Sequence, residues 1–189
     1  MERPASASDR ALIERARSGD DRAFRDLVER HESRVAATVI GMLGPGDDAE
    51  DVGQETFIRL YRSLDRFRGD SSLGTYLTRI AINLSLTALK RRKRRLSRFV
   101  SQDATESDRP EASWDPRDQL ERTEDVRRVR AAVGRLAPDH RAVVVLRMID
   151  GYSTKETAEI LDIPSGTVMS RLARAMERLG REMKESEDG

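Results

Sequence analysis

The sequence has 189 residues, of which 37% are hydrophobic, 37% are charged and only 4% are aromatic. This composition does not suit one thick apolar core and favours thin helical bundles with a large surface. The absence of cysteine excludes disulfides, thiolate zinc sites and a cysteine nucleophile. The net charge of +1 means that any site for nucleic acid has to be a local basic patch.

Helical periodicity and turn signals divide the first half of the chain into four helices. The first is expected over residues 9–16, after a disordered stretch over 1–8, and the second ends at Gly44-Pro45-Gly46. Asp47 or Asp48 is expected to cap the third helix. Residues 65–72 form a loop, and Ser71 or Ser72 begins a long fourth helix. The inward positions of the last two helices are predicted to be Val52, Thr56, Leu60 and Leu64, and then Leu73, Leu77, Ile80, Ala81, Leu84 and Ala88.

The composition changes sharply after this first unit, which spans residues 9–96. The next stretch is rich in serine, acidic residues and proline and contains Trp114, which predicts an acidic, flexible linker over 97–119. A second helical unit follows over 120–185, with a short tail over 186–189. Its apolar run Val143–Leu146 could be a strand by propensity, but helical patterns on both sides favour a helix. The predicted fold class is therefore all-α, with two small helical domains joined by a flexible linker.

The stretch Tyr152–Leu179 is typical of a helix-turn-helix. Ser153 and Glu156 fit a capping box at the start of its first helix. Pro164 ends that helix because it disfavours helical geometry at the preceding residue, and Ser165 is expected to cap the second helix. In this motif the second helix enters the major groove of DNA, although an ordinary helical hairpin with a solvated basic face is the alternative. The apolar stripe of the second helix is Val168, Leu172, Ala175, Leu179 and Met183.

The long helix of the first unit offers a second candidate surface for nucleic acid. Tyr76, Arg79 and Asn83 share a face with Lys90, opposite the apolar stripe. An aromatic ring can stack on an unpaired base, and arginine and asparagine can pair with base edges or phosphates. The run of cations over 90–95 contains no acid and would attract phosphate, although the helix dipole alone also favours cations at this end.

The third helix is acidic in its N-terminal half. The helix dipole favours carboxylates there, so the acids could be purely structural. However, Asp51, Gln54, Glu55 and Ile58 recur at spacings of three and four, which places an apolar residue among charges on one face. Such a face would suit a protein partner and would repel DNA.

Two long motifs resemble extracytoplasmic-function sigma factors, the small alternative specificity subunits of bacterial RNA polymerase. The stretch 48–84, DAEDVGQETFIRLYRSLDRFRGDSSLGTYLTRIAINL, together with the basic run, resembles sigma region 2. The stretch 136–179, LAPDHRAVVVLRMIDGYSTKETAEILDIPSGTVMSRLARAMERL, resembles sigma region 4. The two motifs occur in the order typical of the family, with an acidic linker between them.

The resemblance implies a role for each of these surfaces. The acidic helix corresponds to the family's surface for the clamp coiled coil of the largest polymerase subunit, with Asp51, Gln54, Glu55 and Ile58 as contacts. In the family, a second set of residues reads and opens the −10 element, in part by holding a flipped base. The corresponding residues here are Arg68, Ser71, Tyr76, Arg79, Asn83, Lys90 and Arg91. Residues that correspond to those reading the −35 element are Ser165, Thr167, Ser170, Arg171 and Arg174.

The sequence departs from the usual family pattern at four positions in the two stretches that resemble DNA-reading helices. Tyr76 stands where tryptophan is usual, which preserves the capacity to stack. Met169, Ala173 and Met176 stand where lysine, histidine and arginine are common. The second helix of the helix-turn-helix is therefore less basic than usual. The strength and the sequence preference of −35 binding are expected to differ from those usual in the family.

The sequence thus predicts an alternative sigma factor that binds core RNA polymerase, recognises −35 and −10 promoter elements and promotes DNA opening. Expected partners are core polymerase, promoter DNA and an anti-sigma factor. One alternative is a stand-alone helix-turn-helix regulator, which leaves the candidate surfaces of the first unit unexplained. The other is a sigma mimic that titrates an anti-sigma factor, against which the intact basic run 90–95 argues.

No acid–base pair, metal-spaced cluster or phosphate-binding glycine loop occurs in the sequence. His31 lies on the apolar stripe of its helix and is expected to be packed or partly exposed. We therefore predict no enzymatic activity, no cofactor and no metal. No apolar run approaches the roughly 18 residues of a membrane span, and the N-terminus has no apolar signal core, so we expect a cytoplasmic protein that is monomeric when free.

Overall fold

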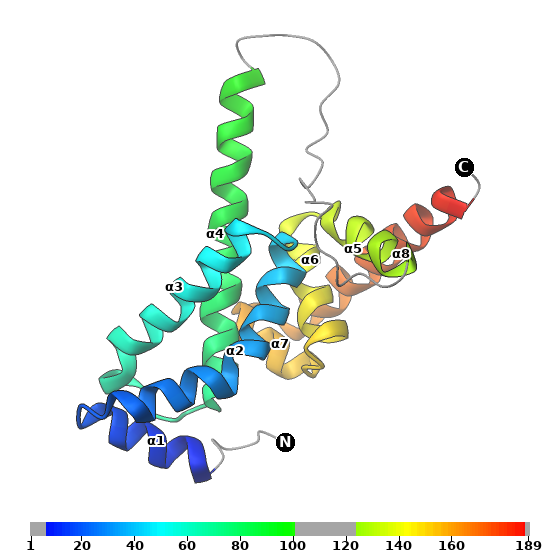
Figure 1. Ribbon diagram of the computed structural model, residues 1–189. Coiled ribbons are helices and arrows are strands. Elements are labelled where there is room, and N and C mark those ends of the chain that lie inside the picture. The colour runs from blue at the N-terminus through cyan, green and yellow to red at the C-terminus, as the bar shows by residue number, and fades with distance from the viewer. Residues whose placement is uncertain (1–6, 101–123, 188–189) are drawn as a thin grey trace.

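The computed structural model describes residues 7–100 and 124–187, and in these ranges the regular structure is entirely helical (Figure 1). The predicted N-terminal stretch and linker lie mostly outside the described residues, and Trp114 lies wholly outside them. The last helix continues to Glu187 and so passes residue 185, where the second unit was expected to end. The N-terminal domain contains α1 (Ala7–Arg17), α2 (Asp21–Leu43), α3 (Asp47–Ser63), the 3-10 turn η1 (Leu64–Arg66) and α4 (Leu73–Val100). The C-terminal domain contains α5 (Glu124–Gly134), α6 (Pro138–Val144), the π-helical turn η2 (Val145–Ile149), α7 (Thr154–Leu161) and α8 (Ser165–Glu187).

The helix boundaries differ from the predictions at two places in the N-terminal domain. α1 begins at Ala7, inside the stretch that was expected to be disordered. α4 continues to Val100 and so passes residue 96, where the first unit was expected to end. Residues 96–100 contain neither glycine nor proline, so nothing local stops the helix. The C-terminal half of α4 extends beyond the neighbouring helices (Figure 1).

Two of the expected helix caps also differ. Gly46 is the N-cap of α3, and it provides no side-chain hydrogen bond, while Asp47 and Asp48 lie within the first turn. There they still favour the positive end of the helix dipole. Ser165 is the first residue of α8 rather than its N-cap, because the backbone carbonyl of Pro164 accepts the N–H groups at 167 and 168. By contrast, Ser72 accepts from the Thr75 N–H at 3.1 Å and begins α4 as predicted.

The core of the N-terminal domain lies where α2 packs against α1, α3 and α4. The predicted inward stripes are confirmed in the main, since Val52, Thr56, Leu60, Leu64, Leu73, Leu77 and Ala81 are all buried. His31 is buried as well, with Nε2 3.2 Å from an oxygen of Asp9 in α1. Burial lowers the pKa of His31, and this outweighs the opposite effect of the Asp9 carboxylate. The histidine is therefore a packed residue that joins α1 to α2.

The helix-turn-helix is confirmed in its local details. The Ser153 hydroxyl accepts from the Glu156 N–H at 3.2 Å, and the Ser153 N–H donates to the Glu156 carboxylate at 2.8 Å, which completes the predicted capping box. α7 ends at Asp162, whose φ of 52° is left-handed. The buried stripe of α8 packs on α5 and α6. The run 143–146, for which a strand was the alternative, is helical as expected. The stripe and its partners include Leu172, Ala175 and Leu179 with Val133, Leu136 and Val144.

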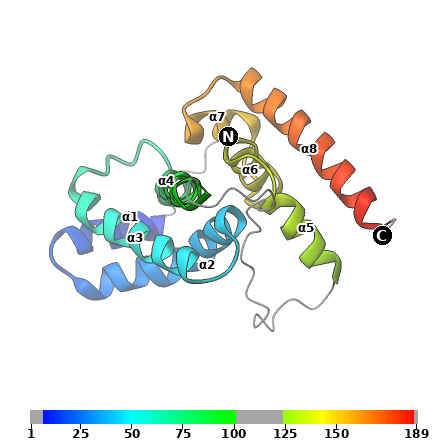
Figure 2. The same ribbon diagram turned by 90° about the horizontal axis from the view of Figure 1, so that it is seen from above.

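The two domains also pack on each other, which the sequence analysis did not predict (Figure 2). An apolar cluster joins Met42 of α2 and Ile82 of α4 to the C-terminal domain, where its buried members are Ala142, Val145, Leu146, Tyr152 and Ile160. α4 is consequently buried on two faces. The second face was missed because hydroxyl residues, Thr78 and Ser85, occupy it beside Ile82 and read as a polar surface.

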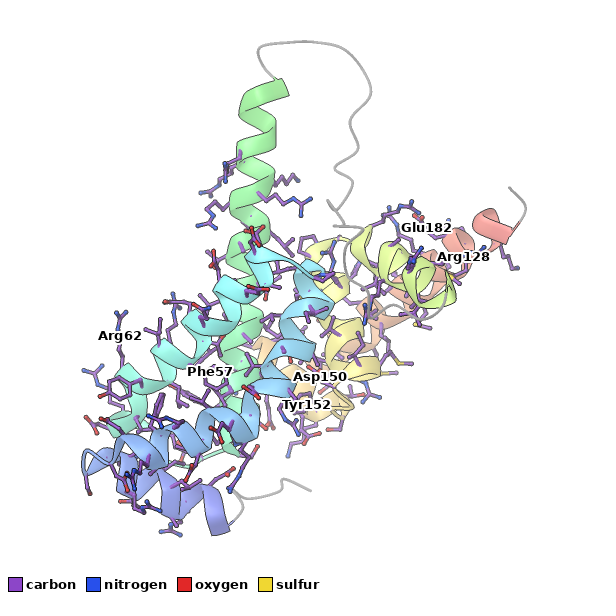
Figure 3. All side chains as sticks on the ribbon, in the orientation of Figure 1. Phe57, Arg62, Arg128, Asp150, Tyr152 and Glu182 are labelled. Atoms are coloured by element: carbon purple, nitrogen blue, oxygen red, sulfur yellow. The ribbon has the colours of Figure 1, made fainter. Side chains whose placement is uncertain are left out.

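Hydrogen bonds surround this apolar cluster. Thr38 of α2 donates through its hydroxyl to Asp150 at 2.9 Å, and the hydroxyls of Thr78 and Tyr152 are 3.0 Å apart. Figure 3 shows Asp150 and Tyr152 close to α2, where the two domains meet. Arg141 of α6 donates to the backbone carbonyl of Met42 at 2.6 Å. We call this apolar cluster and its surrounding hydrogen bonds the interdomain contact.

Stability is expected to depend on the titration of Asp150. Burial raises the pKa of its carboxyl to about 6, although the hydrogen bond from Thr38 and the charge of Arg34 act in the opposite direction. An unfolded aspartate has a pKa of about 3.9. Between roughly pH 4 and 6, the folded chain therefore binds more protons at this position than the unfolded chain does. This carboxyl therefore stabilises the fold less as the pH rises through that window. The Asp150→Asn variant should gain stability relative to the parent as the pH rises, measured by urea unfolding at pH 4.5 and 7.5.

Asp26→Asn, at an exposed position of α2, provides the matched control. It removes a carboxyl that lies outside the interdomain contact. Its free energy of unfolding should therefore differ from that of the parent by nearly the same amount at pH 4.5 and at pH 7.5. If the free energy of unfolding of Asp150→Asn also differed from that of the parent by the same amount at both pH values, the raised pKa of Asp150 would be contradicted.

Candidate functional site

The loop before α4 carries Arg68 and Ser71, two of the predicted −10 contacts. Arg68 is exposed and Ser71 is half-buried. Arg17, at the end of α1, fastens the start of this loop, because its guanidinium donates to the Leu64 carbonyl at 3.1 Å and also to the Phe67 carbonyl. Arg17 was not among the predicted site residues, because no local pattern links it to a loop about 50 positions later. The loop is thus held by a helix from elsewhere in the domain.

The next two predicted contacts, Tyr76 and Arg79, are not free in this conformation. The Tyr76 ring lies 5.1 Å from the Phe67 ring, centroid to centroid, and its hydroxyl donates to the Ser63 hydroxyl at 3.0 Å. Arg79 is half-buried and donates to the Glu159 carbonyl of α7 at 3.1 Å, while its Nε is buried without a hydrogen-bond partner among the described residues. The face predicted from helical spacing is therefore partly covered.

The rest of that face is open. Asn83, Lys90 and Arg91 are exposed, as are the cations at 93–95. Arg92 is half-buried and lies near enough to Arg141 that its charge adds to burial in lowering the pKa of Arg141 to about 10. The structure thus combines an exposed amide, which can donate and accept hydrogen bonds, with a cationic helix end, as a nucleic-acid surface requires.

The acidic face of α3 lies on the same domain. Asp51, Gln54 and Ile58 are exposed, and Glu55 is half-buried and pairs with Arg59 at 3.0 Å. Tyr61 extends this face, because it lies three residues after Ile58 and is 58% exposed. Its ring packs edge-on against Phe24 of α2 at 5.0 Å. Tyr61 was not among the predicted contacts, although its spacing of three residues from Ile58 indicates the same helix face.

The predicted −35 contacts lie along the start of α8. Ser165, Ser170 and Arg174 are exposed, whereas Thr167 is half-buried. Arg171 is half-buried too and pairs with Asp139 of α6 at 3.2 Å. The methionines that replace the family's usual cations at 169 and 176 are 54% and 45% exposed. The outer face of α8 therefore combines hydroxyls and arginines with apolar side chains.

Within 7–100 and 124–187, no group of three or more histidine, aspartate or glutamate side chains could hold a metal ion. None of the helices in these ranges is both long and apolar enough to cross a membrane.

Comparison with known proteins identifies both domains. Residues 27–95 match the family described as Sigma-70 region 2, and residues 127–179 match Sigma-70, region 4. Over 178 residues the chain is 39% identical to an ECF RNA polymerase sigma-E factor of Escherichia coli strain K12, covering 91% of this chain and 92% of that protein. The chain is an extracytoplasmic-function sigma factor. A sigma-E factor of Haemophilus influenzae is 36% identical over 177 residues, with 91% of this chain and 93% of that protein covered.

Two solved structures share the fold. CnrH, in complex with the cytosolic domain of CnrY, superposes with a TM-score of 0.65 at 29% identity and covers 94% of this chain and 97% of that one. RpoE of Bartonella quintana, in complex with the anti-sigma factor NepR, superposes with a TM-score of 0.66 at 25% identity and covers 85% of this chain and 96% of that one. This chain is an alternative sigma factor, and its N-terminal and C-terminal domains are regions 2 and 4.

Proposed function

We propose that this sigma factor binds core RNA polymerase through α3, recognises −35 DNA with α8 and −10 DNA with α4, and promotes promoter opening. The observation that carries the proposal is the two-sided surface of region 2. An exposed acidic face on α3 and an exposed cationic end of α4 belong to one domain, so one domain can hold a protein and DNA at once.

For core polymerase, we propose that Asp51, Gln54, Glu55 and Ile58 contact the clamp coiled coil of the largest subunit. An apolar side chain surrounded by carboxylates favours a partner helix with basic side chains around an apolar position. The exposed ring of Tyr61 would extend that contact.

For the −10 element, we propose that the loop residues Arg68 and Ser71 hold an unstacked base and that Asn83 pairs with a base edge. Lys90 and Arg91 would bind backbone phosphate and make the affinity dependent on salt. Tyr76 and Arg79 belong to the same surface. For the −35 element, the contacts would be Ser165, Thr167, Ser170, Arg171 and Arg174, and Arg171 would exchange its pairing with Asp139 for phosphate or base.

An anti-sigma factor is the further partner that we propose, because RpoE of Bartonella quintana, which shares this fold, is bound to the anti-sigma factor NepR in its solved structure. Transcription initiation requires no covalent step by the sigma factor, so we propose a non-enzymatic protein without cofactor that acts as a monomer beside cytoplasmic polymerase.

Run-off transcription with purified core polymerase and a library of promoter fragments tests the proposed function. A product that depends on this chain is expected from a subset of promoters sharing two elements. If well-folded protein supports no open complex on any fragment, the proposal is wrong.

Charge reversal on α3 is expected to weaken core association. In the double variant Asp51→Lys/Glu55→Lys, like charges would face a basic partner, and the affinity for core polymerase should fall about tenfold or more. The measurement is fluorescence anisotropy of the labelled sigma factor titrated with core enzyme. Asp26→Lys, a reversal at an exposed position of α2, should leave the affinity unchanged. Equal affinities for the double variant and the parent would remove α3 from the proposed interface.

A further inference from the structure

An apolar side chain lies near the beginning of α8, among the proposed −35 contacts. α8 begins at Ser165, so Met169 is its fifth residue, and 54% of it is exposed. Val168, directly before it, is fully buried, whereas Ser170, directly after it, is exposed. Successive residues of a helix differ by about 100° in direction, so Met169 lies beside Ser170 on the outer side. Met169 therefore shares the outer face of α8 with the proposed DNA contacts.

The neighbouring helix holds this methionine in place. α7 and the start of α8 lie side by side (Figure 2). The hydroxyl of Thr154, the first residue of α7, donates to the Sδ atom of Met169 at 3.6 Å. A methionine side chain is flexible, and ordering it on binding costs conformational entropy. Since Thr154 already restricts Met169 in the free protein, less entropy is lost when a partner binds.

Thymine is the base that such a side chain can recognise in the major groove. The base edges there present hydrogen-bond donors and acceptors, and the C5-methyl group of thymine is the only apolar group among them. A thioether has no charge and is at most a weak acceptor, so Met169 offers little to a polar base edge or to phosphate. Contact between its terminal methyl group and the thymine methyl group would instead remove apolar surface from water.

The place of Met169 on α8 suits a base edge better than a protein partner. In a helix-turn-helix, the N-terminal residues of the second helix contact base edges, and Met176 lies about 10.5 Å farther along the helix axis. A protein partner would need a broader apolar face. Met169, Ala173 and Met176 form a narrow exposed stripe, and the exposed side chains of Ser170 and Arg174 border it. Met169 is therefore the candidate for the thymine contact.

We propose that Met169 contacts the C5-methyl group of one thymine in the −35 element and so contributes to the promoter specificity of this chain. The inference rests on the proposed function of α8 in −35 recognition and names one base that α8 prefers. A cation at this position would bind phosphate in any sequence, so the methionine replaces general affinity with a preference for one T·A pair. Promoters of this sigma factor should therefore share at least one thymine, on either strand, within the −35 element.

Deoxyuridine tests this contact, because it lacks only the methyl group and keeps the base pairing of thymine. The holoenzyme, which is this chain bound to core polymerase, is titrated with duplexes of a promoter found by run-off transcription. In each duplex one −35 thymine is replaced by deoxyuridine. At one position the replacement should weaken binding by the parent about fourfold, the value expected for one buried methyl group.

Met169→Ala should remove this preference. Its holoenzyme should bind the thymine and deoxyuridine duplexes equally at the position where the parent discriminates. The variant changes an exposed side chain, so its Tm should match that of the parent. An undiminished preference in Met169→Ala would show that another residue contacts the methyl group, and the proposal would fall. It would fall as well if the parent tolerated deoxyuridine at every −35 position.

Two variants control for side-chain size and for the loss of a methionine. Met169→Leu keeps an apolar side chain at the same place and should retain most of the preference for thymine over deoxyuridine. Met148→Ala removes a methionine that is 59% exposed in η2, outside α8, and should retain all of it. Loss of the preference in Met169→Leu, or an equal loss in Met148→Ala and Met169→Ala, would contradict a methyl contact by Met169.

Met169→Lys provides the opposite change. A lysine would contact phosphate, so affinity should rise for the thymine and deoxyuridine duplexes alike. The slope of log affinity against log salt concentration should become steeper by about 1. A preference for thymine that survives in Met169→Lys would contradict the proposal.

Failure of the proposed function would give a different result. In that case the parent holoenzyme opens no promoter in the run-off assay, and the inference falls with it. Transcription from promoters with two shared elements, together with indifference to the thymine methyl group, would contradict only the role of Met169. Shared −35 elements without a T·A pair would do the same.

Discussion

Asn83→Ala is expected to abolish most promoter opening while leaving core binding intact. The side chain is exposed on α4 and contributes no packing, so truncation should change stability by less than about 0.5 kcal/mol. An amide that pairs with a base edge contributes about 1–3 kcal/mol, which corresponds to roughly a 5-fold to 150-fold loss of open complex. Run-off transcription and permanganate reactivity of the melted strand measure the loss.

Two comparisons make this result specific. Affinity for core polymerase, measured by anisotropy, should equal that of the parent, because Asn83 lies on α4 and the proposed core contact lies on α3. Ser33→Ala, at an exposed position of α2, should leave opening unchanged. A loss of core affinity in Asn83→Ala as large as its loss of opening would refute the proposed role.

Arg141→Met is expected to destabilise the chain more than any exposed substitution. The arginine is only 7% exposed and donates to the Met42 carbonyl at 2.6 Å, to the Leu136 carbonyl at 3.2 Å and to the Gly134 carbonyl. These carbonyls lie at or just beyond the ends of α2 and α5, where helices leave acceptors unsatisfied and the dipole favours a cation. Methionine would fill similar space but leave the acceptors unpaired.

Each unpaired buried acceptor costs about 1–3 kcal/mol. Methionine also removes the penalty of burying the charged guanidinium, which offsets part of that cost. We expect a net loss of about 3 kcal/mol, which lowers the Tm of a chain of this size by about 10 °C. Differential scanning calorimetry measures the shift. Arg135→Met is the control, since its ion pair with Glu182 is exposed and such pairs contribute at most about 1 kcal/mol. Similar shifts for the two variants would contradict the assigned role of Arg141.

Features that depend on neighbours along the chain could be predicted from the sequence. The helices, the inward stripes of α3, α4 and α8 and the Ser153–Glu156 capping box all follow from spacings within a few turns. Burial and pairing that depend on residues distant in the sequence could not be predicted. Thr38 and Thr78 look like surface hydroxyls in their own helices, and only region 4 provides the partners that make them buried. The interdomain contact was missed for that reason.

The candidate sites show the same division. Helical spacing placed Tyr76, Arg79 and Asn83 on one face, but it could not show that Phe67 packs on the tyrosine or that α7 holds the arginine. It also identified Arg171 on the outer stripe of α8 without its pairing to Asp139. Sequence spacing identifies which residues share a face, whereas the partners that occupy them depend on tertiary packing.

The hydrogen bonds from Arg17 to the loop before α4 have a consequence for how region 2 is isolated. The match to Sigma-70 region 2 begins at residue 27, and α1 ends before it. A fragment cut at that boundary would lack the donor to the Leu64 and Phe67 carbonyls, and it would expose the core that Leu12 and Ile13 of α1 help to cover. The smallest piece able to present this loop in an ordered form is therefore longer than the shared family segment and has to include α1.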